Sequence, residues 1–221
     1  MIAGKEMRVR LTFTEPILGG EPGNKDIYRD YIGSKAPDAE TLAEELEYLP
    51  EEEVVDKGKT IFHRLDDGTP VLLDNHIRGF FKSTCGFLRK VSGSESSKIK
   101  AYKKEIDGLI FVFGDCKGSK KPIRIQNVKE IGELQRPLRA QTAQGERISL
   151  AISEMIPEGC FVEFTVAMMK KDHEPAVREW LDYGEYTGIG QWRNASYGRF
   201  TWEELPPADP KAKKNDAVKF V

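Results

Sequence analysis

The sequence predicts a mixed α+β fold in which strands outnumber helices and the helices cover one face of a sheet. Strict apolar–polar alternation over residues 7 to 14 and a continuous apolar run over residues 109 to 113 predict strands. Apolar residues at helical spacing between residues 74 and 91 predict the main helix. Strands mixed with helices and interrupted by long loops are typical of an α+β architecture.

The composition is that of a soluble globular protein, with 39% hydrophobic and 32% charged residues in a chain of 221. Such a chain forms one large domain or two small ones. No run of 18 apolar residues occurs, which excludes a spanning helix. The N-terminal stretch has no apolar core followed by a small-residue cleavage site, so we expect a cytoplasmic protein with no membrane partner.

The cysteines and histidines follow no metal-ligand pattern. The three cysteines are isolated, which argues against disulfides and a zinc knuckle and favours reduced apolar residues: Cys85, Cys116 and Cys160. The three histidines, His63, His76 and His173, lack a spacing such as HExxH. We therefore expect no metal and no cofactor, and interpret His63 as a surface residue and His76 as a helix cap.

The charge is uneven, although the net charge is only −2. Residues 38 to 56 carry nine acids and no base, whereas residues 78 to 104 carry eight bases and one acid. Phosphates respond mainly to charges within about 10 Å, so the basic block could bind a polyanion. The alternative is that both blocks are solvated faces.

The first half of the chain begins with the alternating strand, whose open face carries Arg8 and Arg10. The main helix begins at Asp74 or Asn75 and ends near Val91. The other predicted elements here are a long loop at 15 to 36, an acidic helix at 37 to 49, a strand at 60 to 65 and a turn at Asp67-Gly68. The stripe expected to be buried in the main helix is Ile77, Phe80, Phe81, Thr84, Leu88 and Val91.

The second half is richer in strands. We expect the run at 109 to 113 to be a central strand, and residues 148 to 156 and 160 to 168 to form a hairpin around Pro157-Glu158-Gly159. The other expected elements are a flexible loop at 92 to 97, a weak strand at 123 to 128, an extended polar stretch at 134 to 149, a helix at 175 to 183 and a strand at 197 to 202.

A glycine-rich segment, GIGQWRNASYGRF, spans residues 188 to 200. Glycine lets the backbone approach a ligand closely, and successive N–H groups with arginine can hold phosphate. The segment follows a helix and precedes a strand, which is the wrong order for a dinucleotide fingerprint, and no GKS or GKT is present. The alternative is a glycine-rich turn with no ligand.

Four motifs in order resemble the CRISPR RAMP superfamily, most closely its Cas7-like backbone subunits. They are LTFTEPILGG after the first strand, LLDNHIRGFFKSTCGFLRK for the main helix, EMIPEGCFVEF at the turn near residue 157, and GIGQWRNASYGRF near the C-terminus. The resemblance departs at Asp74-Asn75-His76, where the family has glycine and serines, and in the acidic segment at 37 to 56.

The resemblance implies a ferredoxin-like (RRM-related) core with long loop insertions and an RNA-binding function directed at the guide-RNA backbone. It implies RNA, further copies of the chain and other CRISPR effector subunits as partners. We expect one domain over residues 1 to 205, with an acidic helical insertion near 37 to 56, and a flexible tail over 206 to 221. The expected RNA-binding residues are Arg78, Lys82, Arg89, Lys90, Gly188, Gly190, Gln191, Arg193, Asn194, Ser196 and Arg199.

Two further functions stay open. A free-standing relative carried by a mobile element would bind a nucleotide or interfere with a CRISPR complex. An endoribonuclease would use a histidine or a loop aspartate, Asp26 or alternatively Asp30, since some backbone subunits cut RNA with an aspartate in the loop after the first strand and other family members with a histidine. Tyr28, Tyr31, Trp192 and Tyr197 could stack bases, whereas Trp180 and Trp202 fit core packing.

Overall fold

The structure is a computed structural model that describes residues 4–23, 59–114, 122–142 and 145–207, with the backbone alone for 137–142 and 145–150. Several predictions lie outside the described residues: the acidic helix and insertion, the tail from residue 208, Cys116, and the loop residues Asp26, Asp30, Tyr28 and Tyr31.

The described residues form two sheets, and the α+β fold class is confirmed. The larger sheet has the order β12-β1-β11-β8-β6-β5, with β7 also paired to β11. Its strands are β1 (Lys5–Phe13), β5 (His63–Arg64), β6 (Pro70–Leu72), β7 (Ile110–Phe113), β8 (Ile123–Gln126), β11 (Phe161–Met168) and β12 (Phe200–Leu205). The second sheet has the order β2-β10-β4-β3 with β9 on β10, built from β2 (Ile17–Leu18), β3 (Glu21–Pro22), β4 (Lys59–Ile61), β9 (Gly132–Thr142) and β10 (Gly145–Ile156).

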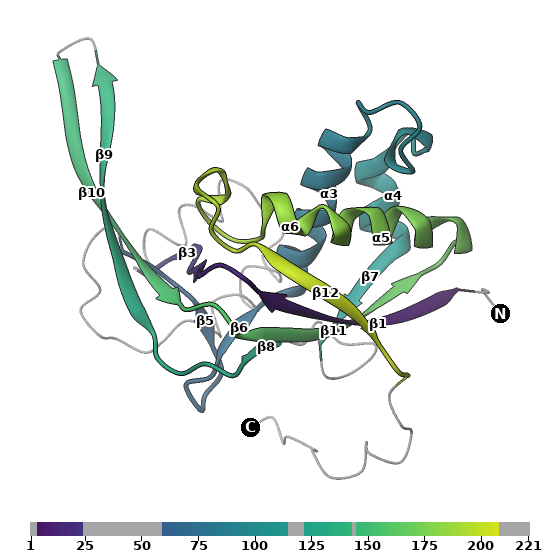
Figure 1. The fold of residues 1–221 in the computed structure, drawn as a ribbon, viewed down its shortest axis with the longest axis horizontal. Coiled ribbons are helices and arrows are strands. Elements are labelled where there is room, and N and C mark those ends of the chain that lie inside the picture. The colour runs from purple at the N-terminus through teal and green to yellow at the C-terminus, as the bar shows by residue number, and fades with distance from the viewer. Residues whose placement is uncertain (1–3, 24–58, 115–121, 143–144, 208–221) are drawn as a thin grey trace.

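The helices lie together on one side of the larger sheet, as predicted (Figure 1). They are α3 (Asp74–Leu88), α4 (Tyr102–Leu109), α5 (Glu174–Asp182) and α6 (Gly184–Thr187), with the 3-10 turns η1 (Ser96–Lys98), η2 (Lys171–His173) and η3 (Arg193–Ala195). No helix among the described residues is long and apolar enough to cross a membrane.

The alternation of β1 produces the expected two faces. Met7, Val9 and Leu11 are buried, and the strand pairs antiparallel with β11 and β12. On the other face Arg8 and Arg10 both donate to the carboxylate of Glu163 at 2.6 Å. Arg10 also donates to Glu203 of β12 at 3.0 Å, so both arginines of this face are paired with acids of the neighbouring strands.

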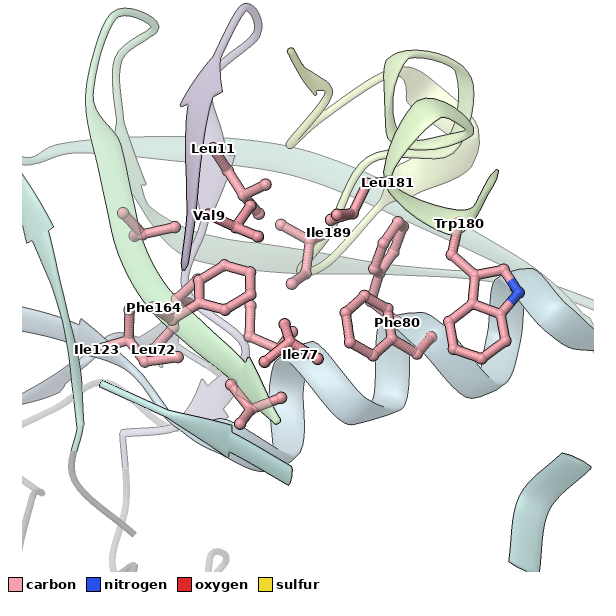
Figure 2. Packing of buried hydrophobic residues seen from close by; sticks show 14 of the residues in the cluster. Val9, Leu11, Leu72, Ile77, Phe80, Ile123, Phe164, Trp180, Leu181 and Ile189 are labelled. Carbon is pink, nitrogen blue, oxygen red and sulfur yellow. The ribbon is translucent and has the colours of Figure 1, made fainter. Parts of the chain in front are cut away.

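The core lies between α3, α5 and the larger sheet. Figure 2 shows Ile77 and Phe80 of α3 among the labelled side chains of β1, β11 and α5. Trp180 is fully buried, as predicted, and Trp202 packs partly against this core. Val91 was expected in the buried stripe but is 55% exposed, because α3 ends at Leu88.

The predicted hairpin around residue 158 is wrong. β10 and β11 are joined by that turn but belong to different sheets, so the turn is a corner. The backbone of β10 is instead paired along β9, from Gly145↔Thr142 to Met155↔Gly132. The polar stretch expected to be merely extended thus forms half of a long two-stranded arm that projects beyond the rest of the fold (Figure 1).

Two other expectations need correction. β7 lies at an edge rather than at the centre of the sheet: it pairs with Thr165–Met168 of β11, while β8 pairs with Phe161 and Val162 of the same strand. The segment from residue 92 to 97 is not a free loop, because Ser96 is buried in η1 and bonded to Glu179 of α5.

Candidate nucleic-acid interface

The glycine-rich segment is a loop closed at its base by contact between two glycines. Gly188 (φ +65°) and Gly198 (φ +71°) are both buried, and Ile189 N–H donates to the carbonyl oxygen of Gly198 at 2.9 Å. A Cβ on Gly198 would lie 1.9 Å from the carbonyl oxygen of Ile189. These two glycines are therefore required by the chain itself, whether or not a ligand binds.

The tip of the loop is held in an unusual backbone conformation. Trp192 and Ser196 are left-handed residues on either side of η3, with φ of +54° and +75°. Within the described residues, no hydrogen bond is formed by the backbone N–H groups of residues 190 to 194. Backbone N–H groups without a protein partner are the donors that hold phosphate oxygens in other proteins, which makes the tip a candidate anion site.

The loop lies against both the second sheet and α3. Gly198 N–H donates to the carbonyl oxygen of Pro16 at 2.8 Å, and Gln191 Nε2 donates to that of Gly20 at 3.3 Å. Arg193 Nη1 donates to Ser83 Oγ of α3 at 3.3 Å. The main helix and the loop are therefore neighbours, although Ser83 and Arg193 are 110 residues apart in sequence.

A pocket of about 580 Å³ lies between these elements. Its polar lining comes from the sheets, the main helix and the loop. Glu21 belongs to β3 of the second sheet and His63 to β5 of the larger sheet. Asn75 and His76 lie at the start of α3, and Gln191 and Arg193 lie on the loop. Its apolar lining includes Leu18, Ile61, Phe62, Leu72, Phe80 and Ile189.

The basic side chains of α3 point to acids rather than to the loop. Arg78 Nη2 donates to Asp74 Oδ2 at 2.8 Å, and Lys82 Nζ donates to Asp107 Oδ1 at 2.8 Å. Asp107 is also 3.9 Å from Arg78 Nη1. The predicted basic surface of the helix is thus partly neutralised by α4, a helix that no pattern in the sequence predicted.

The remaining predicted site residues lie in different surroundings, and only some of them reach the pocket. Gly190, Gln191 and Arg193 meet the start of α3 at the pocket. Asn194 is exposed on η3, whereas Arg199 has a buried Nε with no hydrogen-bond partner among the described residues. Arg89 lies over the ring of Tyr102 at 5.1 Å, and Lys90 is exposed just beyond the end of α3.

Sequence reasoning missed one arginine at the loop. Arg136 of β9 lies 3.5 Å from the ring centroid of Trp192, and Trp192 stacks on Tyr197 at 5.3 Å. Burial lowers the pKa of Arg136. Trp192 and Tyr197, the two predicted base-stacking residues on this loop, therefore stack on each other within the protein. No local pattern marks Arg136, because it reaches the loop only through the fold of the arm.

Of the two histidines at the pocket, His76 has the role that the sequence predicted and His63 does not lie where the sequence predicted. His76 is the helix-cap residue expected from the sequence: its Nδ1 accepts the backbone N–H of Leu73 at 3.2 Å. His63 was expected at the surface but is 1% exposed, because it lies on β5 beneath the pocket. Burial opposes ionisation of the neighbouring Glu21, but the imidazoles of His63 and His76 outweigh it and lower the pKa of Glu21 to about 2.

Comparison with known proteins rests on structure. No protein-family model matches the chain, and a search of curated proteins finds no match. A chain in the cryo-EM structure of the Type III-B Cmr-beta bound to cognate target RNA matches with a TM-score of 0.50 and 11% identity, over 92% of this chain. The fold of this chain is therefore similar to that of a chain in the Type III-B Cmr-beta structure.

The resemblance indicated by the four motifs is thus confirmed at the level of the fold alone. This chain spans 59% of the length of the Cmr-beta chain that it matches. Cmr6 from Pyrococcus furiosus is a weaker match, with a TM-score of 0.41 and 10% identity, over 91% of this chain and 99% of that one.

Proposed function

We propose that this protein is an RNA-binding subunit that holds the backbone of a guide RNA within a CRISPR ribonucleoprotein, beside other copies of itself or other effector subunits. The observation that carries the proposal is that the backbone N–H groups of residues 190 to 194 have no partner among the described residues, on a loop whose Arg193 guanidinium contacts α3. The RAMP-type fold supports it.

The chemistry of the loop suits phosphate rather than a base edge. Backbone N–H groups and a guanidinium donate hydrogen bonds to anionic oxygens regardless of sequence. The aromatic side chains at the loop are stacked on each other and beneath Arg136, so the loop presents donors more than open rings. Binding of this kind is independent of base sequence and weakens steeply with salt.

The test is the affinity for fluorescein-labelled single-stranded RNA, measured by anisotropy at several salt concentrations. Arg193→Ala should weaken binding roughly tenfold and reduce the salt slope by about 0.7, the loss of one phosphate contact. Arg178→Ala is the matched control, because that arginine of α5 pairs with Glu174 at 3.0 Å and does not line the pocket.

Binding that is independent of salt would overturn the proposal. An equal loss of RNA affinity in Arg193→Ala and Arg178→Ala would also overturn the proposal, provided that both variants unfold at the wild-type temperature. Purification without nuclease gives a second readout: RNA should be retained by the wild-type protein and reduced in Arg193→Ala.

A second candidate is a free-standing relative that binds a nucleotide. The pocket favours it, because about 580 Å³ lies within the usual range for small-molecule sites. A thermal-shift screen with nucleoside mono- and triphosphates distinguishes the two functions. Stabilisation by a free nucleotide without measurable RNA binding would support this candidate over the subunit role.

Endonuclease activity at Asp26 stays a prediction, since that residue lies outside the described residues. Cleavage of RNA by the wild type with magnesium, lost in Asp26→Ala, would establish it. Equal inertness of both proteins would remove it.

A further inference from the structure

We propose that Glu21, His63 and His76 form a binding site for one divalent transition-metal ion such as Zn²⁺, at the wall of the pocket. The inference does not depend on RNA binding, and it goes against the expectation from sequence that no metal is bound.

The three side chains converge from separate elements. Glu21 lies on β3, His63 on β5 and His76 in the first turn of α3. Glu21 Oε1 is 3.1 Å from His76 Nε2 and 3.7 Å from His63 Nε2, and one potential ligand atom from each residue lies within 4.8 Å of the others. Tetrahedral ligand atoms at 2.0–2.2 Å from one Zn²⁺ are about 3.3–3.6 Å apart, so the two distances from Glu21 Oε1 suit a shared ion.

Burial supports a cation here. The side chain of Glu21 is 14% exposed, and its Oε2 is buried with no hydrogen-bond partner among the described residues. A buried carboxylate needs a compensating positive charge. A divalent ion would supply that charge. It could also coordinate Oε2 of Glu21, which has no hydrogen-bond partner among the described residues.

The ligand set indicates which class of metal would bind. Two imidazole nitrogens and one carboxylate suit zinc and neighbouring transition metals, whereas Mg²⁺ prefers oxygen ligands alone. All three residues line the pocket, so water can complete the coordination. A site with three protein ligands and an open position differs from a closed structural zinc site.

Metal binding has a consequence at the start of α3. His76 Nδ1 now accepts the N–H of Leu73, so in the neutral ring Nε2 carries the proton and faces Glu21. Coordination of a neutral imidazole through Nε2 places the proton on Nδ1, so Nδ1 can no longer accept the N–H of Leu73 and that hydrogen bond is lost. Zinc should therefore change the His76 tautomer and increase hydrogen exchange at the Leu73 amide.

The experiment is titration of the full chain, stripped with a chelator, with Zn²⁺ alone in a calorimeter, with Co²⁺ absorption as a second readout. We expect one ion per chain and a rise in unfolding temperature. Glu21→Gln and His76→Asn should each weaken binding at least tenfold; asparagine keeps an oxygen that can accept the Leu73 N–H while removing Nε2.

Glu105→Gln is the matched control, because Glu105 also contacts a histidine, His173, at 2.8 Å, but belongs to no three-residue cluster in the described chain. It should bind zinc as the wild type does. Absence of one-to-one binding in the wild type would overturn the site. Equal binding by wild type, Glu21→Gln and His76→Asn, or loss of binding in Glu105→Gln, would also overturn it.

Discussion

The backbones of Gly188 and Gly198 are in direct contact: a Cβ on Gly188 would lie 2.6 Å from the carbonyl carbon of Gly198. This contact closes the loop that carries Gln191 and Arg193 to the start of α3. The two glycines shape the loop, and the residues between them provide its chemistry.

Replacing Gly198 by alanine should destabilise the protein by about 2 kcal/mol or more, because the new Cβ meets backbone at a left-handed residue. The control is Gly93→Ala: Gly93 has a φ of +84°, and a Cβ there would meet nothing within 4 Å, so the change should cost about 1 kcal/mol. Urea unfolding measures both. Equal losses would show that the glycine contact does not constrain the loop.

Removing the acid at Asp107 should strengthen RNA binding. Asp107 lies 2.8 Å from Lys82 and 3.9 Å from Arg78, and Asp107→Asn frees both cations from it. Exposed pairs of this kind contribute roughly 0.2–1 kcal/mol, so affinity should rise by about 1.5- to 5-fold at low salt. Asp172→Asn, an exposed site on η2, is the control and should have no effect. Unchanged binding in Asp107→Asn would exclude Arg78 and Lys82 from the interface.

Ser96→Ala should destabilise the junction between η1 and α5. Ser96 Oγ accepts the N–H of the buried Trp180 at 2.8 Å and donates to Glu179 at 2.6 Å. Leaving a buried donor unsatisfied costs about 1–3 kcal/mol. The neighbouring Ser97→Ala, at an exposed site, should cost less than about 0.5 kcal/mol. A loss in Ser97→Ala as large as in Ser96→Ala would contradict this role.

The described cysteines should be unreactive in the folded protein. Burial raises the pKa of Cys160 to about 12 and raises that of Cys85. In a Cys116→Ala variant, Ellman's reagent at pH 8 should therefore titrate neither thiol in the native state. Both should react in guanidinium chloride. Rapid native reaction would show that one of these thiols is accessible as thiolate.

Local sequence patterns predicted the strands and helices that bury one regular face against the core. The alternation of β1 and the stripe of α3 were sufficient, because each element buries one regular face. The corner at Pro157–Gly159 was not predictable, since the same turn joins either a hairpin or two sheets. Only the pairing of β10 with β9 decides between them.

The candidate site also combines features that a local motif predicts with features that only the tertiary fold creates. The glycine loop and its arginine were visible as a motif, but the ion pairs of Arg78 and Lys82 with Asp107 depend on α4. Glu21, His63 and His76 are 42 and 13 residues apart, so no spacing rule brings them together. Their cluster arises from the packing of two short strands against the start of α3.

The most direct measurement of the central claim is photocrosslinking of the full chain to RNA that contains 4-thiouridine, followed by mass spectrometry of the linked peptides. If α3 and the glycine loop hold one RNA backbone together, cross-links should occur both within residues 74 to 90 and within residues 188 to 199, and they should decrease in Arg193→Ala. Cross-links confined to the β9–β10 arm or to the β1–β12 face, with both segments unlabelled, would contradict the claim.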